Sequence, residues 1–179
     1  MSLRSNATLE AFINRIINNR DIMNILKLPV INKNDTQEII DAKRNILINN
    51  FVTKTAQVPY ELGTSFEDVE IDGIKYSDFG KIRITVSFAQ GIKLNHDLFG
   101  KPQVDINIYY DNTEINNIFK LLDLISDEFS GQDLIIELEN EKNFIRNIRN
   151  EGQTAQTSII NNYERMGIRF SFFATVYKN

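Results

Sequence analysis

The closing stretch of this 179-residue chain, residues 167–179, constrains its fold more than any other segment. Apolar and polar residues alternate there, as in a β-strand with one buried face. One set of alternate residues is apolar: Ile168, Phe170, Phe172, Ala174 and Val176. The other set is polar apart from two aromatics: Arg169, Ser171, Phe173, Thr175 and Tyr177. Aromatics on both faces require two buried surfaces, whereas a chain of this length has one core.

Phe173 and Tyr177 are the two residues of this strand that need a partner surface. Single exposed aromatics are ordinary on protein surfaces. Alternatively, both rings pack under a loop of the same chain or on a neighbouring subunit. We favour burial, so the sequence predicts a protein that functions by assembling.

Residues 81–89 and 103–110 alternate in the same way and predict two more strands. Their apolar sets are Ile82, Ile84, Val86 and Phe88 in the first, and Val104, Ile106, Ile108 and Tyr110 in the second. One apolar and one polar face predict an antiparallel sheet that is covered on one side only. Residues 134–138 predict a further short strand. Asp72-Gly73, between two short alternating runs, predicts a hairpin.

Two segments in the first 50 residues have the apolar spacing of amphipathic helices. Residues 8–26 carry a clear stripe, and Pro29 follows its end. The second segment, residues 35–49, begins with Asp35 and Glu38, a pattern that resembles a capping box.

A third helix is predicted over residues 114–129 from the clearest stripe in the chain. The stripe consists of Ile115, Ile118, Phe119, Leu122, Ile125 and Phe129. Asp111, Asn112 and Thr113 are candidate N-caps, and Gly131 stands where a helix often ends in a left-handed residue.

The remaining segments have weaker patterns. Residues 91–100 predict a loop or protruding arm, and residues 152–158 predict a polar loop. Residues 139–150 are ambiguous. If they were helical, Lys142, Arg146 and Arg149 would share one face, as a solvated face or a subunit contact.

Together these patterns predict an α+β fold. We expect a mostly antiparallel sheet with an N-terminal amphipathic helix and a second long helix packed on one face. Residues 1–179 would form a single domain with three parts: a helical part (1–50), a hairpin or insertion (51–80) and a sheet-plus-helix core (81–179).

Composition restricts the possible functions. With 20 basic and 24 acidic residues the net charge is −4, so binding nucleic acid through phosphates is not expected as the main function. The absence of cysteine removes disulfides and thiolate metal sites. No apolar run reaches the roughly 18 residues of a membrane span, so we expect a protein made and used in solution.

Asp68, Glu70 and Asp72, followed by Gly73, resemble the start of a calcium-binding loop, with oxygen ligands at positions 1, 3 and 5 and glycine at 6. The twelfth position should be glutamate, but it is Phe79. The apolar residues between the acids fit a strand better than a loop. We interpret the segment as a hairpin with solvated carboxylates.

The only histidine, His96, falls in the predicted loop 91–100 and is interpreted as a surface residue. One histidine without cysteine cannot supply the usual zinc ligands. Six carboxylates could include a glycosidase-type pair: Glu67, Asp68, Glu70, Asp72, Asp105 and Asp111. Such pairs lie in clefts lined with aromatics, and the chain has no tryptophan. The sequence therefore predicts no catalytic residue, no cofactor and no metal.

The order of these elements resembles that of a known group of proteins. An N-terminal helix leads into antiparallel strands, the strand at 104–110 runs directly into the helix at 114–129, and the chain ends on an aromatic strand, 170–177. This resembles the tail-terminator and neck (tail-completion, head–tail joining) proteins of tailed bacteriophages.

The resemblance implies a ring, commonly of six subunits, that ends the tail tube or joins it to the head connector. Tail-tube and connector proteins would be its partners, DNA would pass through the lumen, and catalysis and membranes would play no part. The protein would be made in the bacterial cytoplasm and reside in the virion. The expected subunit contacts lie in the 91–100 loop and the closing strand: Lys93, His96, Phe99, Arg169, Phe173 and Tyr177.

Two alternative functions belong to other classes. One is a small partner-binding α+β module of a host cell. The other is a small hydrolase or transferase that uses acidic residues near the hairpin.

Overall fold

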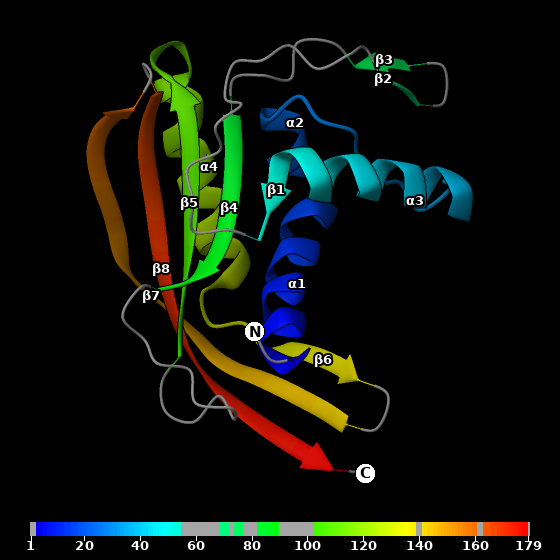
Figure 1. Ribbon diagram of the computed structural model, residues 1–179, viewed down its shortest axis with the longest axis vertical. Helices are drawn as coiled ribbons and strands as arrows, with labels where there is room; N and C mark the ends of the chain where they lie inside the picture. Colours follow the sequence, from blue (N-terminus) through cyan, green and yellow to red (C-terminus); the bar gives the residue numbers. More distant parts are fainter. Residues whose placement is uncertain are drawn as a thin grey trace.

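A six-stranded sheet organises the chain, in the order β1-β4-β5-β8-β7-β6 (Figure 1). The computed structural model describes residues 3–54, 69–71, 74–76, 82–89, 102–138, 141–160 and 163–178. The strands of the sheet are β1 (Val52–Thr53), β4 (Ile82–Phe88), β5 (Gln103–Asp111), β6 (Leu134–Leu138), β7 (Glu141–Ile160) and β8 (Tyr163–Lys178).

The α+β class is confirmed, but the sheet is mixed. β1 pairs in parallel with β4, through Val52 with Ile84, whereas the other pairs are antiparallel. The sequence could not predict β1, because two residues are too few to show an alternating pattern.

The predicted hairpin is confirmed as a separate two-stranded sheet of β2 (Val69–Ile71) and β3 (Ile74–Tyr76). Ile71 pairs with Ile74 on either side of Asp72-Gly73, two residues outside the described part of the chain. The strand conformation of Val69–Ile71 supports the hairpin interpretation over the calcium loop.

The first predicted helix is in fact two helices, α1 (Leu3–Asn18) and α2 (Arg20–Ile25). Asn19 separates them in an extended conformation, and its Oδ1 accepts hydrogen bonds from the backbone N–H groups of Asp21 and Ile22 at 3.0 and 3.1 Å. Asparagine caps a helix in this way because its side chain replaces the missing backbone acceptor. The apolar stripe continues across the break and hides it in the sequence.

The second predicted helix is α3 (Gln37–Ile46), which continues into a π-helical turn, Leu47–Phe51. The expected capping box at Asp35 is wrong. Thr36 is the N-cap, and its Oγ1 accepts from the N–H of Ile39 at 3.4 Å. Asp35 instead accepts from Nζ of the buried Lys43 at 2.7 Å and so neutralises that buried charge.

The third predicted helix is α4 (Ile115–Phe129), preceded by a 3₁₀ turn, Asn112–Glu114. The cap prediction is wrong, since Glu114 occupies the N-cap without a side-chain hydrogen bond. Gly131 has φ +74° as expected. Phe119 is 50% exposed because it lies about 100° around the helix from Ile118, at the border of the buried arc.

Strand β7 corrects two predictions. Residues 139–150 were ambiguous and 152–158 were expected to form a loop, yet Glu141–Ile160 pairs with β8 as one strand. Register shifts after Arg146, after Asn150 and after Gln156 interrupt the alternation that would have indicated a strand. The spacing of Lys142, Arg146 and Arg149 therefore does not place them on a helix.

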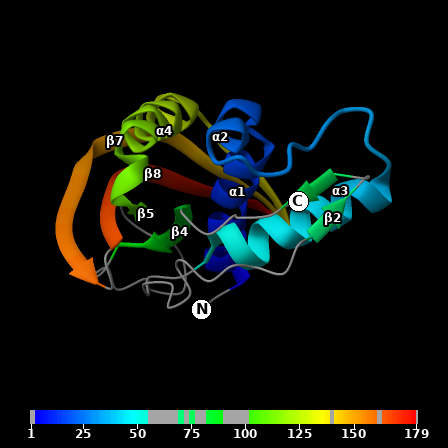
Figure 2. The ribbon, with the colours of Figure 1, turned by 90° about the horizontal axis from the view of Figure 1, so that it is seen from above.

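The core lies between one face of the sheet and helices α1 and α4 (Figure 2). Aromatic rings connect the layers: Phe12 of α1 stacks on Phe129 of α4 with ring centroids 4.8 Å apart, and Phe129 lies 5.4 Å from Phe170 of β8. The apolar residues predicted for 81–89, 103–110 and the closing strand point into this core, as expected, except for Val176, whose side chain is outside the described part of the structure.

The opposite face of the central strands is also buried, so the prediction of a sheet covered on one side only is wrong. Thr85 and Ser171 are fully buried, and Arg83 is 4% exposed. Part of this polar face is satisfied by hydrogen bonds within it, whereas Thr85 Oγ1 has no hydrogen-bond partner among the described residues. Arg169 binds both carboxylate oxygens of Asp105, and Ser171 donates to Glu151.

Candidate functional site: the sheet patch

Three large apolar side chains are strongly exposed among the described residues. Phe119 is 50% exposed, Ile135 59% and Phe173 47%. Ile135 belongs to β6 and Phe173 to β8, at the same end of the sheet (Figure 1).

Strand pairing places Ile135 and Phe173 on one face. Ile135 pairs with Phe144 of β7, and Arg146, two residues further along β7, pairs with Phe173. Paired residues, and residues two apart in a strand, point to the same side of a sheet. We call Ile135, Phe144, Arg146 and Phe173 the sheet patch.

The charge of Arg146 belongs to this surface. Its guanidinium lies 5.0 Å from the centre of the Phe144 ring, and the side chain is exposed. Such a cation over an aromatic face is held by the ring quadrupole. Arg149 pairs with Ser171 across β8, so it lies on the same face, beside the patch, and is also exposed. The patch is thus apolar with a basic border.

The reverse side of these strands is part of the core. Ile136, Ile145 and Phe172 are buried in the core. The bend in β7 after Arg146 is fixed at Asn147, which has φ 55° and donates its backbone N–H to Asp133 Oδ1 at 2.9 Å.

The predicted interface residues have different positions. Phe173 is exposed, in agreement with its need for a partner surface. Arg169 is already used within the chain, because its bond to Asp105 is bidentate and raises the pKa of the guanidinium. Tyr177 of β8 pairs with Lys142 of β7, but its side chain is outside the described part of the structure. Lys93, His96 and Phe99 are outside the described residues.

Sequence reasoning missed Ile135 and Phe144 as members of this surface, and it considered Arg146 as a subunit contact only on a helix. Ile135 stands between two core residues in a continuous apolar run, and β7 was not recognised as a strand. The signal available in the sequence was the apolar run itself. Side chains alternate along a strand, so Ile135 must point away from the protein core when Leu134 and Ile136 point into it.

The buried polar face of the sheet is the second candidate. Asn107 and Thr154 converge over Gly167, where a Cβ would lie 2.6 Å from Asn107 Oδ1 and 2.7 Å from Thr154 Oγ1. At the end of β5, Tyr110 donates to Glu164 at 2.9 Å, and burial followed by this bond raises the pKa of the phenol. These contacts fix the register of the central strands.

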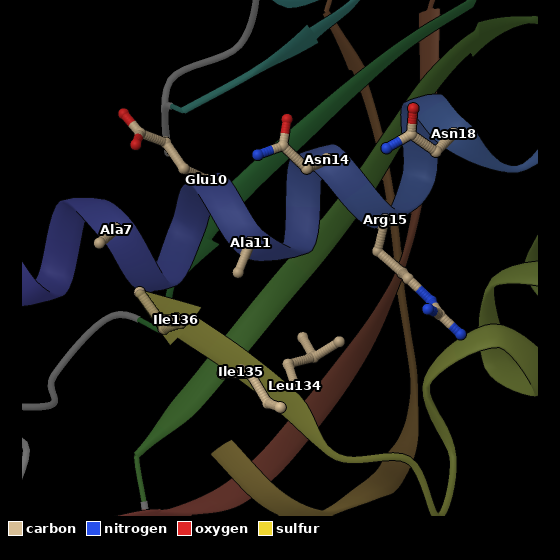
Figure 3. A pocket seen from close by; sticks show the side chains of 9 residues that line it. All are labelled: Ala7, Glu10, Ala11, Asn14, Arg15, Asn18, Leu134, Ile135 and Ile136. Atoms are coloured by element: carbon tan, nitrogen blue, oxygen red, sulfur yellow. The ribbon is translucent and has the colours of Figure 1, made fainter. Parts of the chain in front are cut away.

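A groove of about 410 Å³ lies between α1 and β6 (Figure 3). Ala11 points from α1 toward β6, and Arg15 extends toward α4, where it binds Glu128. The groove is lined by Ala7, Glu10, Ala11, Asn14, Arg15, Asn18, Leu134, Ile135 and Ile136. Ile135 therefore belongs both to the groove and to the sheet patch.

The carboxylates considered for catalysis are not brought together among the described residues. Asp105 is in β5 and paired with Arg169, whereas Glu70 is in the separate β2–β3 sheet. Glu67, Asp68 and Asp72 are outside the described part, and the side chain of Asp111 is not described. The described residues contain no group of three or more metal-ligating side chains.

Comparison with known proteins adds no family to these observations. No protein-family model matches this chain, and no curated protein matches its sequence. In the part of the chain that the structure describes, no helix has the length and apolar character needed to cross a membrane.

Proposed function

We propose that this chain is a structural protein of a tailed bacteriophage that forms a ring at the neck or tail end. The ring would end the tail tube and join it to the head connector by assembly alone, without catalysis. The sheet patch carries this proposal, because it leaves two large apolar side chains of a well-packed chain, Ile135 and Phe173, exposed. The order of elements, with β5 running into α4 and an aromatic closing strand, supports it.

Full burial of a large apolar side chain is worth roughly 1.5–3 kcal/mol. Covering the exposed halves of Ile135 and Phe173 would therefore contribute about 1 kcal/mol each. In a closed ring this gain recurs at every subunit contact, so a modest patch stabilises the whole assembly.

The charge of the chain fits a passage for DNA. The net charge is −4, so a ring of such subunits would not hold DNA through its phosphates. DNA would then move through the lumen as cargo. The protein would be made in the bacterial cytoplasm and reside in the virion.

Native mass spectrometry of the wild-type chain and of Phe173→Ser tests this proposal. We expect a closed ring of identical subunits for the wild type and smaller species for the variant. Asn45→Ser, an exposed change on α3 outside the sheet patch and the α1–β6 groove, is the control and should retain the ring. A strictly monomeric wild type at high concentration would contradict the proposal.

The α1–β6 groove favours one alternative, a partner-binding module of a host cell. Among the described strands β6 is the last in its sheet, and an extended peptide can add to such an edge. Gene neighbourhood separates the two functions, since a phage structural gene lies among portal, capsid and tail genes.

A further inference from the structure

We propose that the subunit contact joins two different surfaces of this chain, with the sheet patch of one copy packed on the outer face of α4 of the next. This inference rests on the proposed assembly function and adds which surfaces meet. The occupant of the sheet patch is therefore a second copy of the chain.

The outer face of α4 carries the third exposed apolar side chain, Phe119. Asp123 and Asp127 follow it at spacings of four residues and are also exposed. Residues spaced in this way are neighbours on one side of a helix. We call Phe119, Asp123 and Asp127 the helix patch. Lys120 is exposed at its border.

The two patches are complementary in charge. The sheet patch combines Ile135 and Phe173 with Arg146, beside Arg149, and the helix patch combines one aromatic ring with two carboxylates. Within the described residues no salt bridge involves these arginines or these aspartates. Both charge sets are therefore available to a partner.

The positions of the patches determine the symmetry of the contact. Phe173 is on the face of the sheet opposite to Phe172, which packs 5.8 Å from Phe12 of α1 in the core. In the helix patch, Phe119 lies at the border of the buried arc of α4, and Asp123 and Asp127 lie further round the helix, away from the buried Ile118. The two patches are thus on outer surfaces of different layers (Figure 2).

Pairing of either patch with itself is disfavoured, because it would bring like charges together. A contact between unlike surfaces is heterologous, and such contacts form rings or filaments instead of two-fold dimers. The charge pattern therefore selects the kind of assembly that a ring requires.

Charge reversal tests this pairing in the full chain. Arg146→Glu, or Asp123→Lys with Asp127→Lys, places like charges across every contact and should weaken association about tenfold or more. Combining all three changes in one chain restores opposite charges, so the triple variant should assemble again. Asp41→Lys on α3 and Arg20→Glu on α2 are exposed charge controls that should assemble like the wild type.

Mixing gives a second readout. A chain with only Arg146→Glu and a chain with only the two aspartate changes each retain one intact patch. Equal amounts should form a mixed assembly in which the two chains alternate, because the intact patches pair with each other and the two charge-reversed patches again carry opposite charges.

Native mass separates failure of this inference from failure of the proposed function. If the wild type forms a ring and the charge variants form the same ring, the pairing of these patches is wrong and the proposed function stands. If the wild type is monomeric at high concentration, both are wrong. Loss of assembly in the single-patch variants with recovery in the triple variant supports the pairing.

Discussion

The guanidinium of Arg169 donates to both oxygens of the Asp105 carboxylate, at 2.6 and 2.8 Å, across the β5–β8 pair. This bond joins the closing strand to the centre of the sheet. A residue expected to contact another subunit therefore contributes first to the fold of its own chain.

Replacing Asp105 should weaken the fold. Asp105→Asn removes the charge and one of the two strong bonds, so the free energy of unfolding should fall by roughly 1–2 kcal/mol, allowing for partial exposure of the pair. Urea denaturation measures the loss. Asp41→Asn, on the exposed face of α3, is the control; an equal effect of both variants would contradict this role for Asp105.

The Asp35–Lys43 pair should make stability depend on pH. The hydrogen bond from Lys43, followed by that from the backbone N–H of Asn32, lowers the pKa of Asp35 in the folded chain. A carboxyl group whose pKa is lowered on folding stabilises the folded chain at pH values above its unfolded pKa, which is about 3.9. This stabilisation is lost as the pH falls through the folded pKa.

The stability difference between wild type and Asp35→Asn should accordingly be constant above about pH 5 and shrink below about pH 4. Chemical denaturation at a series of pH values measures it. A difference that grows toward acid would show that the ion pair does not stabilise the fold.

Gly167 should not tolerate a side chain. A Cβ there would lie 2.6 Å from Asn107 Oδ1 and 3.1 Å from the backbone carbonyl oxygen of Ile106. Gly167→Ala should therefore destabilise the chain by about 1–3 kcal/mol. Asn107→Ala in the same chain should recover part of this loss in thermal melts, and strictly additive effects would argue against the contact.

Adjacent phenylalanines on β8 should respond in opposite ways. Phe172 is fully buried, so Phe172→Ala should cost about 3–5 kcal/mol of stability. Phe173 is 47% exposed, so Phe173→Ala should change stability by no more than about 0.5 kcal/mol and act on assembly instead. Thermal melts with native mass measurements distinguish the two; a large loss of stability in Phe173→Ala would place that ring in the core.

The sequence predicted those elements whose pattern is local. Strands β4 and β5 alternate cleanly, and α4 shows its stripe and its terminal Gly131, so local rules suffice. Strand β7 was missed because its register shifts disturb the alternation and its pairing with β8 is tertiary information. Asn19 broke the first helix although the stripe was continuous, because capping depends on backbone angles that the pattern does not contain.

The candidate site was predictable only in part. Phe173 was identified from its place on the polar set of the closing strand. Ile135 and Arg146 join it through the pairing of three strands, which a single sequence does not specify. The burial of the polar sheet face was also unexpected, because polar residues alone do not reveal whether they face water or one another.

Electron microscopy of the purified wild-type chain at high concentration tests the central claim most directly. The account predicts closed rings of uniform diameter with a central opening, formed by this chain alone and absent in Phe173→Ser. Isolated single subunits throughout the wild-type sample, or open filaments in place of rings, would contradict it.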